Sequence, residues 1–315
     1  MHQRRLYSAL ILCTTIIAAL LCGCSIKKMA VRSVANVLSS EGGTVFTGDN
    51  DPQLVGDAIP FALKMYESLL AADSCNPRLL LATGRLCCMY AYAYIQAPAE
   101  QMADAQNEEQ RRQLKRAKNL FIRGRDYVLR GMEINHRGFR DLLNRNKSDS
   151  AMALMSAKDT SYLYWAAASW MGAVSADKFN LGLIMTISRS VAMMKRVIEL
   201  CDGYGDGAAH EFFISYYGSM PPSMGGSEQK AREHFAKAIE LSHNVKCGPY
   251  VSLATAVCIK KQDRAEFTDL LNKALAVDVN ASLPNRLVNI IGQQKARWYL
   301  EHADDFFLES GEEKP

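Results

Sequence analysis

Residues 218–242, "GSMPPSMGGSEQKAREHFAKAIELS", restrict the fold more than any other stretch of this chain. Two prolines and two glycines cannot continue a preceding helix. Ser227 is a favourable N-cap, and Glu228 adds a negative charge to the first turn. The following apolar and small residues recur at steps of three and four, as one face of a helix requires: Ala231, Phe235, Ala238, Ile239 and Ser242. The stretch predicts an amphipathic helix packed against a neighbouring helix.

Similar helix ends recur along the chain, as "RGMEINH", "RVIELCD", "KAIELSH" and "KALAVDV". Two segments, 117–121 and 231–235, match the Ala-x3-Phe element of tetratricopeptide repeats. Strand patterns of useful length are nearly absent. A helical hairpin of this kind buries its apolar face only when it stacks on neighbours, and such a stack curves around a groove. We therefore expect an all-α fold of tetratricopeptide-like hairpins stacked into a curved solenoid, with a generic helical bundle as the alternative.

The N-terminus predicts export and lipidation. Arg4 and Arg5 precede the uncharged residues 6–21, a run too short to span a membrane and typical of a signal peptide. The run ends in "LCGCS", which resembles a bacterial lipobox ending at Cys24. We expect residues 1–23 to be a lipoprotein signal peptide and Cys24 to carry the acyl chains. An ordinary cleaved signal and an uncleaved membrane anchor are the alternatives.

The expected organisation follows from that cleavage site. Residues 24–50 are mostly small, polar and glycine-rich, so they predict a lipidated tether. Residues 51–315 would form the helical domain, on the periplasmic side of a bacterial membrane. The sequence leaves open whether the inner or the outer membrane holds the lipid.

Charge and cysteine usage exclude several classes of protein. Removing Arg4 and Arg5 leaves 35 basic and 33 acidic residues, without a block of like charge that would indicate nucleic-acid binding. The cysteines after Cys24 show neither CxxC spacing nor zinc-site pairing with histidines, so no metal is expected. Most have apolar neighbours, which favours buried free thiols, although a disulfide is possible in an exported protein. These cysteines are Cys75, Cys87, Cys88, Cys201, Cys247 and Cys258.

Enzymatic motifs are not convincing in this sequence. "HEFF" at His210 lacks the second histidine of HExxH, and no GxSxG occurs. The glycines of "DGYGDG" at 202–207 follow a predicted helix rather than a strand, which disfavours a phosphate-binding loop. We expect a protein that is not an enzyme and uses no cofactor.

Two aromatic segments, "SYLYWAAASW" and "HEFFISYYGS", are candidates for a binding cleft. Aromatic rings with polar atoms suit a wet cleft that holds an apolar ligand, although packing between helices is the simpler explanation. Arg189 lies in the apolar run "LIMTISRSVAMM" and should either pair with Asp159 or Asp177 or face a channel. The predicted cleft or pore residues are Tyr162, Trp165, Trp170, Arg189, Phe213, Tyr216 and Tyr217.

Several longer motifs resemble the T component of TRAP transporters: "LLLATGRLCCMYAYAYIQAPAE", "MPPSMGGS", "KAREHFAKAIELS", "CGPYVSLA", "KQDRAEFTDLLNKAL", "NRLVNIIGQQKARWYL" and "DDFF". The resemblance covers nearly the whole mature chain. It implies a periplasmic, membrane-tethered, all-helical protein that forms a homotrimer with a cleft and a pore through each protomer. It further implies association with the solute-binding protein, the P component of a TRAP system.

The leading hypothesis is a non-enzymatic lipoprotein that docks this solute-binding protein and helps pass a small-molecule ligand, including a hydrophobic one, to the permease. A structural lipoprotein scaffold for an envelope complex, without a ligand, is the alternative. An enzyme such as a transglycosylase with unusual site residues is the third hypothesis.

Overall fold

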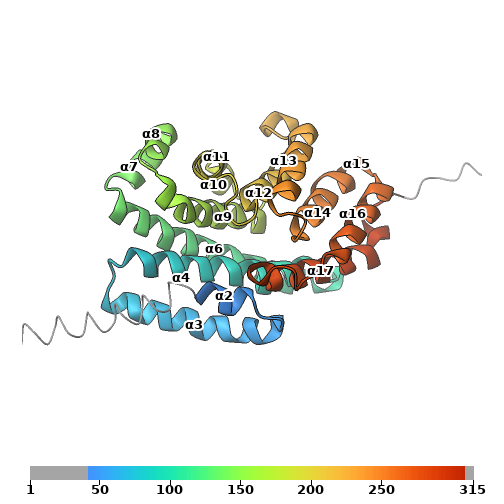
Figure 1. Cartoon of the computed structure of the whole chain (residues 1–315), viewed down its shortest axis with the longest axis horizontal. Coiled ribbons are helices and arrows are strands. Elements are labelled where there is room, and N and C mark those ends of the chain that lie inside the picture. The colour runs from blue at the N-terminus through green and yellow to red at the C-terminus, as the bar shows by residue number, and fades with distance from the viewer. Residues whose placement is uncertain (1–41, 309–315) are drawn as a thin grey trace, which may run out of the picture.

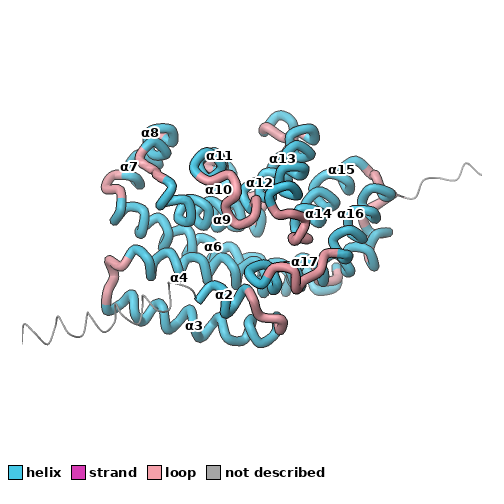
Figure 2. Tube along the Cα trace, viewed as in Figure 1, coloured by secondary structure: helices cyan, strands magenta, loops and turns pink. Residues whose placement is uncertain are grey.

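The computed structural model of the chain describes residues 42–308, which contain helices and no strands (Figures 1 and 2). The prediction of an all-α fold is confirmed. Cys24, the signal peptide and most of the predicted tether lie outside the described residues. Within residues 42–308, every helix is too short or too polar to cross a membrane.

Within the described part of the chain, nine helices of twelve or more residues form the body of the fold: α3 (Pro52–Ala72), α4 (Pro77–Tyr90), α6 (Asn107–Asn135), α9 (Thr160–Ala176), α11 (Ile187–Leu200), α12 (Ala208–Ser219), α13 (Glu228–Leu241), α16 (Arg264–Ala276) and α17 (Arg286–Glu301). Shorter α-helices connect them: α2 (Gly42–Thr47), α5 (Ala97–Glu100), α7 (Phe139–Asn144), α8 (Ser148–Ala153), α10 (Leu181–Ile184), α14 (Gly248–Leu253) and α15 (Ile259–Lys261). Two π-helices, Ala91–Gln96 and Ala254–Cys258, continue α4 and α14.

The helix predicted after "MPPSMGGS" is α13, and its start has the expected chemistry. The hydroxyl of Ser227 accepts a hydrogen bond from the Lys230 amide at 3.3 Å. Gly225 has a φ of +93°, which favours glycine. A Cβ atom on Gly226 would lie 1.8 Å from the Met220 carbonyl oxygen, so only glycine fits there. The turn therefore depends on both glycines.

Successive helices pack against one another through most of the chain. Contacts run from α3 to α4, α6, α9 and α11, then through α12 and α13, and on through α14 and α16 to α17. Figure 1 shows this progression as the colour changes from blue to red. Neighbour-to-neighbour packing is the pattern that stacked hairpins produce.

The C-terminal helix α17 returns to the N-terminal part of the fold, where it contacts α2 and α3. The Arg286 guanidinium donates a hydrogen bond to the Gly48 carbonyl oxygen at 3.3 Å. Phe46 packs against the buried cluster that contains Ile59 and Leu79. The folded body therefore begins before residue 51, the boundary expected from sequence.

The Ala-x3-Phe segments provide core residues, as repeat helices require. Ala117, Phe121 and Ala231 are buried, whereas Phe235 is partly exposed. Gly172 on α9 faces the Phe121 ring so closely that an added Cβ atom would lie 2.4 Å from it. A glycine on one helix and a phenylalanine on the next thus set the α6–α9 packing.

The described cysteines are all free, and four of them are buried: Cys87, Cys88, Cys247 and Cys258. Burial raises the pKa of the Cys87 thiol to about 12, which keeps it protonated and unreactive. The prediction of buried free thiols is confirmed for these four residues. It is wrong for Cys75 and Cys201, which follow the ends of α3 and α11 and are exposed.

Candidate functional site

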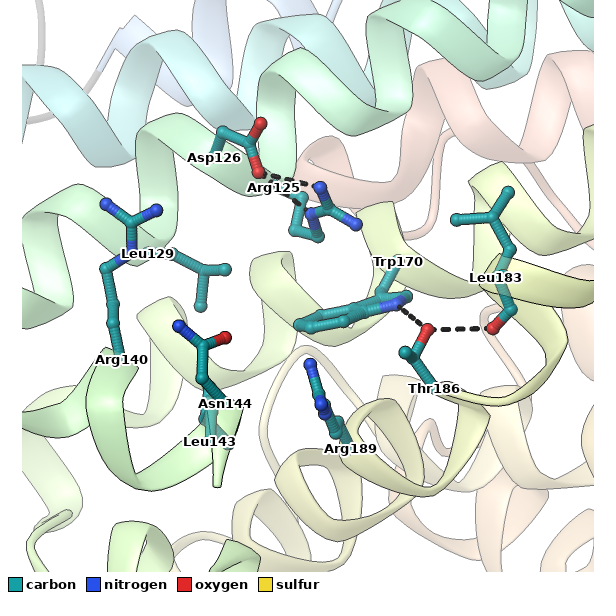
Figure 3. Close-up of a pocket in the computed structure, with 11 residues that line it drawn as sticks. Arg125, Asp126, Leu129, Arg140, Leu143, Asn144, Trp170, Leu183, Thr186 and Arg189 are labelled. Atoms are coloured by element: carbon teal, nitrogen blue, oxygen red, sulfur yellow. Dashed lines mark hydrogen bonds and ion pairs between the residues drawn. The ribbon is translucent and has the colours of Figure 1, made fainter. Parts of the chain in front are cut away.

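A cavity of about 210 Å³ opens among α6, α7, α9, α10 and the start of α11 (Figure 3). Helix α6 contributes three lining residues and α7 another three. The remaining five come from α9, α10 and α11 and the turn before α11. The lining residues are Arg125, Asp126, Leu129, Arg140, Leu143, Asn144, Trp170, Gly182, Leu183, Thr186 and Arg189. Two of the predicted cleft residues, Trp170 and Arg189, are therefore brought together.

The Trp170 indole is held in a fixed orientation at this cavity. Its Nε1 donates a hydrogen bond to Thr186 Oγ1 at 2.9 Å, and that hydroxyl donates to the Leu183 carbonyl oxygen at 2.8 Å. The guanidinium carbons of Arg125 and Arg189 lie 4.7 Å and 5.9 Å from the ring centroid. Figure 3 shows the two cations on opposite faces of the ring. Cation–π attraction on both faces stabilises this arrangement.

The carboxylate partner expected for Arg189 is wrong. Its Nη2 donates instead to the amide oxygen of Asn146 at 3.0 Å. Asp159 Oδ1 lies 2.9 Å from His136 Nε2, and Asp177 Oδ2 lies 2.8 Å from Lys118 Nζ. Both carboxylates therefore have other partners, and Arg189 is left with a neutral partner at the cavity wall.

Trp165 belongs to a second aromatic group, at the contact of α9 with α4. The Arg85 guanidinium lies 5.4 Å from its ring centroid. Tyr164 meets Trp165 edge-on at 5.2 Å and lies 5.1 Å from Tyr204. Burial raises the pKa of the Tyr164 hydroxyl, although the side chains of this group keep some accessible surface. These rings present both apolar faces and polar atoms.

Tyr162 and Phe213 are buried in the hydrophobic core and are not part of the lining of the Trp170 cavity. Tyr162 packs over Gly131, where an added Cβ atom would lie 2.8 Å from its ring. Phe213 stacks against neighbouring rings on α12 and α13. Their aromatic character is used to pack helices together.

Tyr216 and Tyr217 are partly exposed on α12, away from the lining of the Trp170 cavity. The Tyr216 hydroxyl donates a long hydrogen bond of 3.5 Å to the Met224 carbonyl oxygen. The Tyr217 ring lies 5.3 Å from the Lys230 ammonium. The seven predicted residues are thus divided among the cavity, the Trp165 group, the core and the α12–α13 contact.

Three polar side chains that contact one another at the α12–α13 packing were not among the residues predicted from sequence: Asp202, His210 and His234. Asp202 Oδ1 lies 2.8 Å from His210 Nε2, and His210 Nδ1 lies 2.8 Å from His234 Nδ1. Burial lowers the pKa of His234 to about 4, and the neighbouring His210 acts in the same direction. The two histidines are 24 positions apart, so no short motif indicated the contact. These contacts connect α12 and α13 through polar side chains.

The described residues therefore define an all-α protein of successively packed helices, with a surface cavity lined by arginines and a tryptophan. A family model described as the TRAP transporter T-component matches residues 48–307, and this chain belongs to that family. An uncharacterised protein of Treponema pallidum (strain Nichols) is 30% identical over 319 residues, covering 96% of this chain and 99% of that protein. The resemblance inferred from sequence is confirmed. Family membership indicates an accessory role in TRAP transport, which is not an enzymatic role.

Proposed function

We propose that this protein is a lipid-anchored periplasmic accessory component of a TRAP transporter. It docks the solute-binding protein and helps to pass a small ligand toward the permease. The family match over residues 48–307, nearly all of the described chain, is the observation that carries this proposal. The protein would act by binding rather than by catalysis.

The Trp165 group supports a role in ligand passage. Partly exposed aromatic rings offer large apolar faces at little cost in side-chain entropy, and the phenol and guanidinium groups add polar anchors. A ligand with an apolar body and a polar end would suit such a surface.

A direct binding measurement tests the docking step. Purified mature protein and the TRAP solute-binding protein encoded in the same genome should form a complex with a dissociation constant near about 1 μM or tighter. The ligand-loaded and the ligand-free solute-binding protein should bind this protein with different affinities. If docking promotes transfer of the ligand, formation of the complex must change the affinity for the ligand, and the ligand must change the affinity of the complex by the same factor. Equal affinities would favour the scaffold alternative, and the absence of a complex would contradict docking.

Trimer formation is also part of the proposal. The mass of the purified protein in solution, measured by light scattering, should be about three times that of the mature chain. A monomer mass across the accessible concentration range would contradict it.

Replacing Cys24 with alanine should move the protein from the membrane fraction to the soluble fraction. Two or three acyl chains hold a protein stably, whereas the remaining chain has no such anchor within residues 42–308. Fractionation of cells that express wild type or Cys24→Ala, together with mass spectrometry of the N-terminal peptide, measures the effect. Cys22→Ala is the matched control and should stay in the membrane. Membrane retention of a Cys24→Ala protein from which residues 1–23 have been removed would contradict lipidation at this residue.

A further inference from the structure

The loop and short helix beside the Trp170 cavity expose three large apolar side chains. Phe179 is 93% exposed, Leu181 74% and Met185 82%. They fall within a segment of seven residues that also supplies Gly182 and Leu183 to the cavity lining, so they lie beside the cavity. We call Phe179, Leu181 and Met185 the apolar rim. Clustered exposed apolar side chains of this size are typical of interaction sites.

The cavity next to the apolar rim carries uncompensated positive charge. Of its three guanidinium groups, only that of Arg125 pairs with a carboxylate, on Asp126 at 2.9 Å. Arg189 has a neutral amide partner. Within residues 42–308, the Arg140 guanidinium has no hydrogen bond or ion pair. Two cations at this cavity are thus available to an incoming anion.

The arrangement of the two cations favours a carboxylate that enters from solvent. Arg140 comes from α7 and Arg189 from α11, and Figure 3 shows them on different sides of the cavity with Asn144 between them. Guanidinium groups bind carboxylates through paired, charge-assisted hydrogen bonds. The leucines and Trp170 in the same lining suit the methylene groups that carry such a carboxylate.

We propose that the cavity and the apolar rim together bind an acidic, partly apolar segment of a partner protein. One carboxylate of the segment enters between Arg140 and Arg189, and its neighbouring apolar side chains cover Phe179, Leu181 and Met185. The cavity of about 210 Å³ is smaller than the roughly 300 Å³ at which small-molecule pockets begin, but it accommodates one side chain. Arginine, aromatic residues and methionine are also the types enriched at protein interfaces.

The inference rests on the proposed function, because the partner is taken to be the TRAP solute-binding protein. Two single variants test it: Phe179→Ser removes the largest ring of the apolar rim, and Arg140→Glu reverses the unpaired charge. Both side chains are exposed, so neither change should disturb folding. Each variant should weaken binding of the purified solute-binding protein by about tenfold or more, as measured by calorimetry.

Two matched control variants make the same kinds of substitution at exposed residues away from the cavity and the apolar rim. Phe61→Ser alters an exposed ring on α3, and Arg111→Glu alters an exposed cation near the start of α6, roughly 20 Å along the helix from Arg125. Both controls should bind the partner as wild type does.

The outcomes separate the two proposals. If the wild-type protein does not bind the solute-binding protein, the proposed function fails. If wild type binds and both test variants bind equally well, this inference is overturned. If the variants change only the mass of the protein in solution, the face is a contact between copies of this chain, and the inference is again overturned.

Discussion

Replacing Phe121 with alanine should lower the free energy of unfolding by about 3–5 kcal/mol. Phe121 is fully buried on α6 and lies against Gly172 on α9. Truncation would remove the ring from the contact of α6 with both α4 and α9 and leave a cavity that glycine cannot fill. Because α6 is the longest of the described helices and contacts both α4 and α9, the substitution should destabilise the whole domain. Urea unfolding followed by circular dichroism measures the change.

Phe61→Ala is the matched control for this prediction. Phe61 is 76% exposed on α3, so the same truncation should change the free energy of unfolding by no more than about 0.5 kcal/mol. A loss below about 1 kcal/mol for Phe121→Ala, with an unchanged denaturant slope, would mean that the α6–α9 contact contributes little to stability.

Helix positions were predictable where their signals are local. Ser227, Glu228 and the following apolar stripe lie within one short segment, and α13 begins at Glu228 as expected. The Ala-x3-Phe segment at 117–121 correctly indicated two buried residues. The start of the folded body was less predictable. Gly48 accepts a hydrogen bond from Arg286, and Phe46 packs against the cluster that contains Ile59, and no local sequence pattern connects these residues.

The candidate site was predictable only in part, because its residues come from distant segments. Arg189 was identified as unusual in its apolar surroundings and Trp170 as part of an aromatic segment, and both line the cavity. Arg125 and Arg140 lie on other helices and were not singled out. The expected partner of Arg189 was wrong because Asn146, 43 residues earlier, approaches only after α7 and α11 are placed. Sequence therefore indicated which side chains were unusual but not what surrounds them.

Aromatic residues illustrate the same limit. Tyr162 and Trp165 are three residues apart on α9, and sequence gave them the same expected role. The structure buries Tyr162 over Gly131 and leaves Trp165 partly exposed beside Arg85. Their environments depend on the residues of α6 and α4 that face them. Helical periodicity cannot separate a core ring from a cleft ring without that information.

The protein should become less stable as the pH falls from about 6.5 to about 4, and His234, which is partly screened by solvent, should account for about 1–2 kcal/mol of the loss. The folded-state pKa of His234 is about 4, against an ordinary value of 6.5. Between these values the unfolded chain binds a proton at this histidine and the folded protein does not. The free energy of unfolding therefore rises with pH in this window, and the stabilisation is fully present above pH 6.5.

The geometry of the histidine pair explains the sign. In the 2.8 Å contact between His210 Nδ1 and His234 Nδ1, one nitrogen must donate and the other accept. Because Asp202 accepts a hydrogen bond from His210 Nε2, neutral His210 accepts at Nδ1 from the Nδ1–H of His234, and an added proton on His234 goes to its Nε2. Lys230 also opposes a positive charge on His234, while Glu233 and Asp202 only partly offset the burial. Protonation of His234 therefore places a positive charge in a partly buried site, at a cost to the folded protein.

His234→Gln tests this explanation, because glutamine cannot titrate but keeps an amide that can hydrogen-bond to His210. Urea unfolding of both proteins between about pH 7.5 and about pH 4.5 should show a smaller loss of stability for the variant. Other groups also titrate in this range, so the quantity to compare is the difference between the two proteins at each pH. That difference should favour wild type near neutral pH and shift toward the variant as the solution becomes acidic, since only wild type then has a positive charge to accommodate in this partly buried site. A difference that does not change with pH would mean that the histidine contact is an ordinary hydrogen bond without a protonation cost.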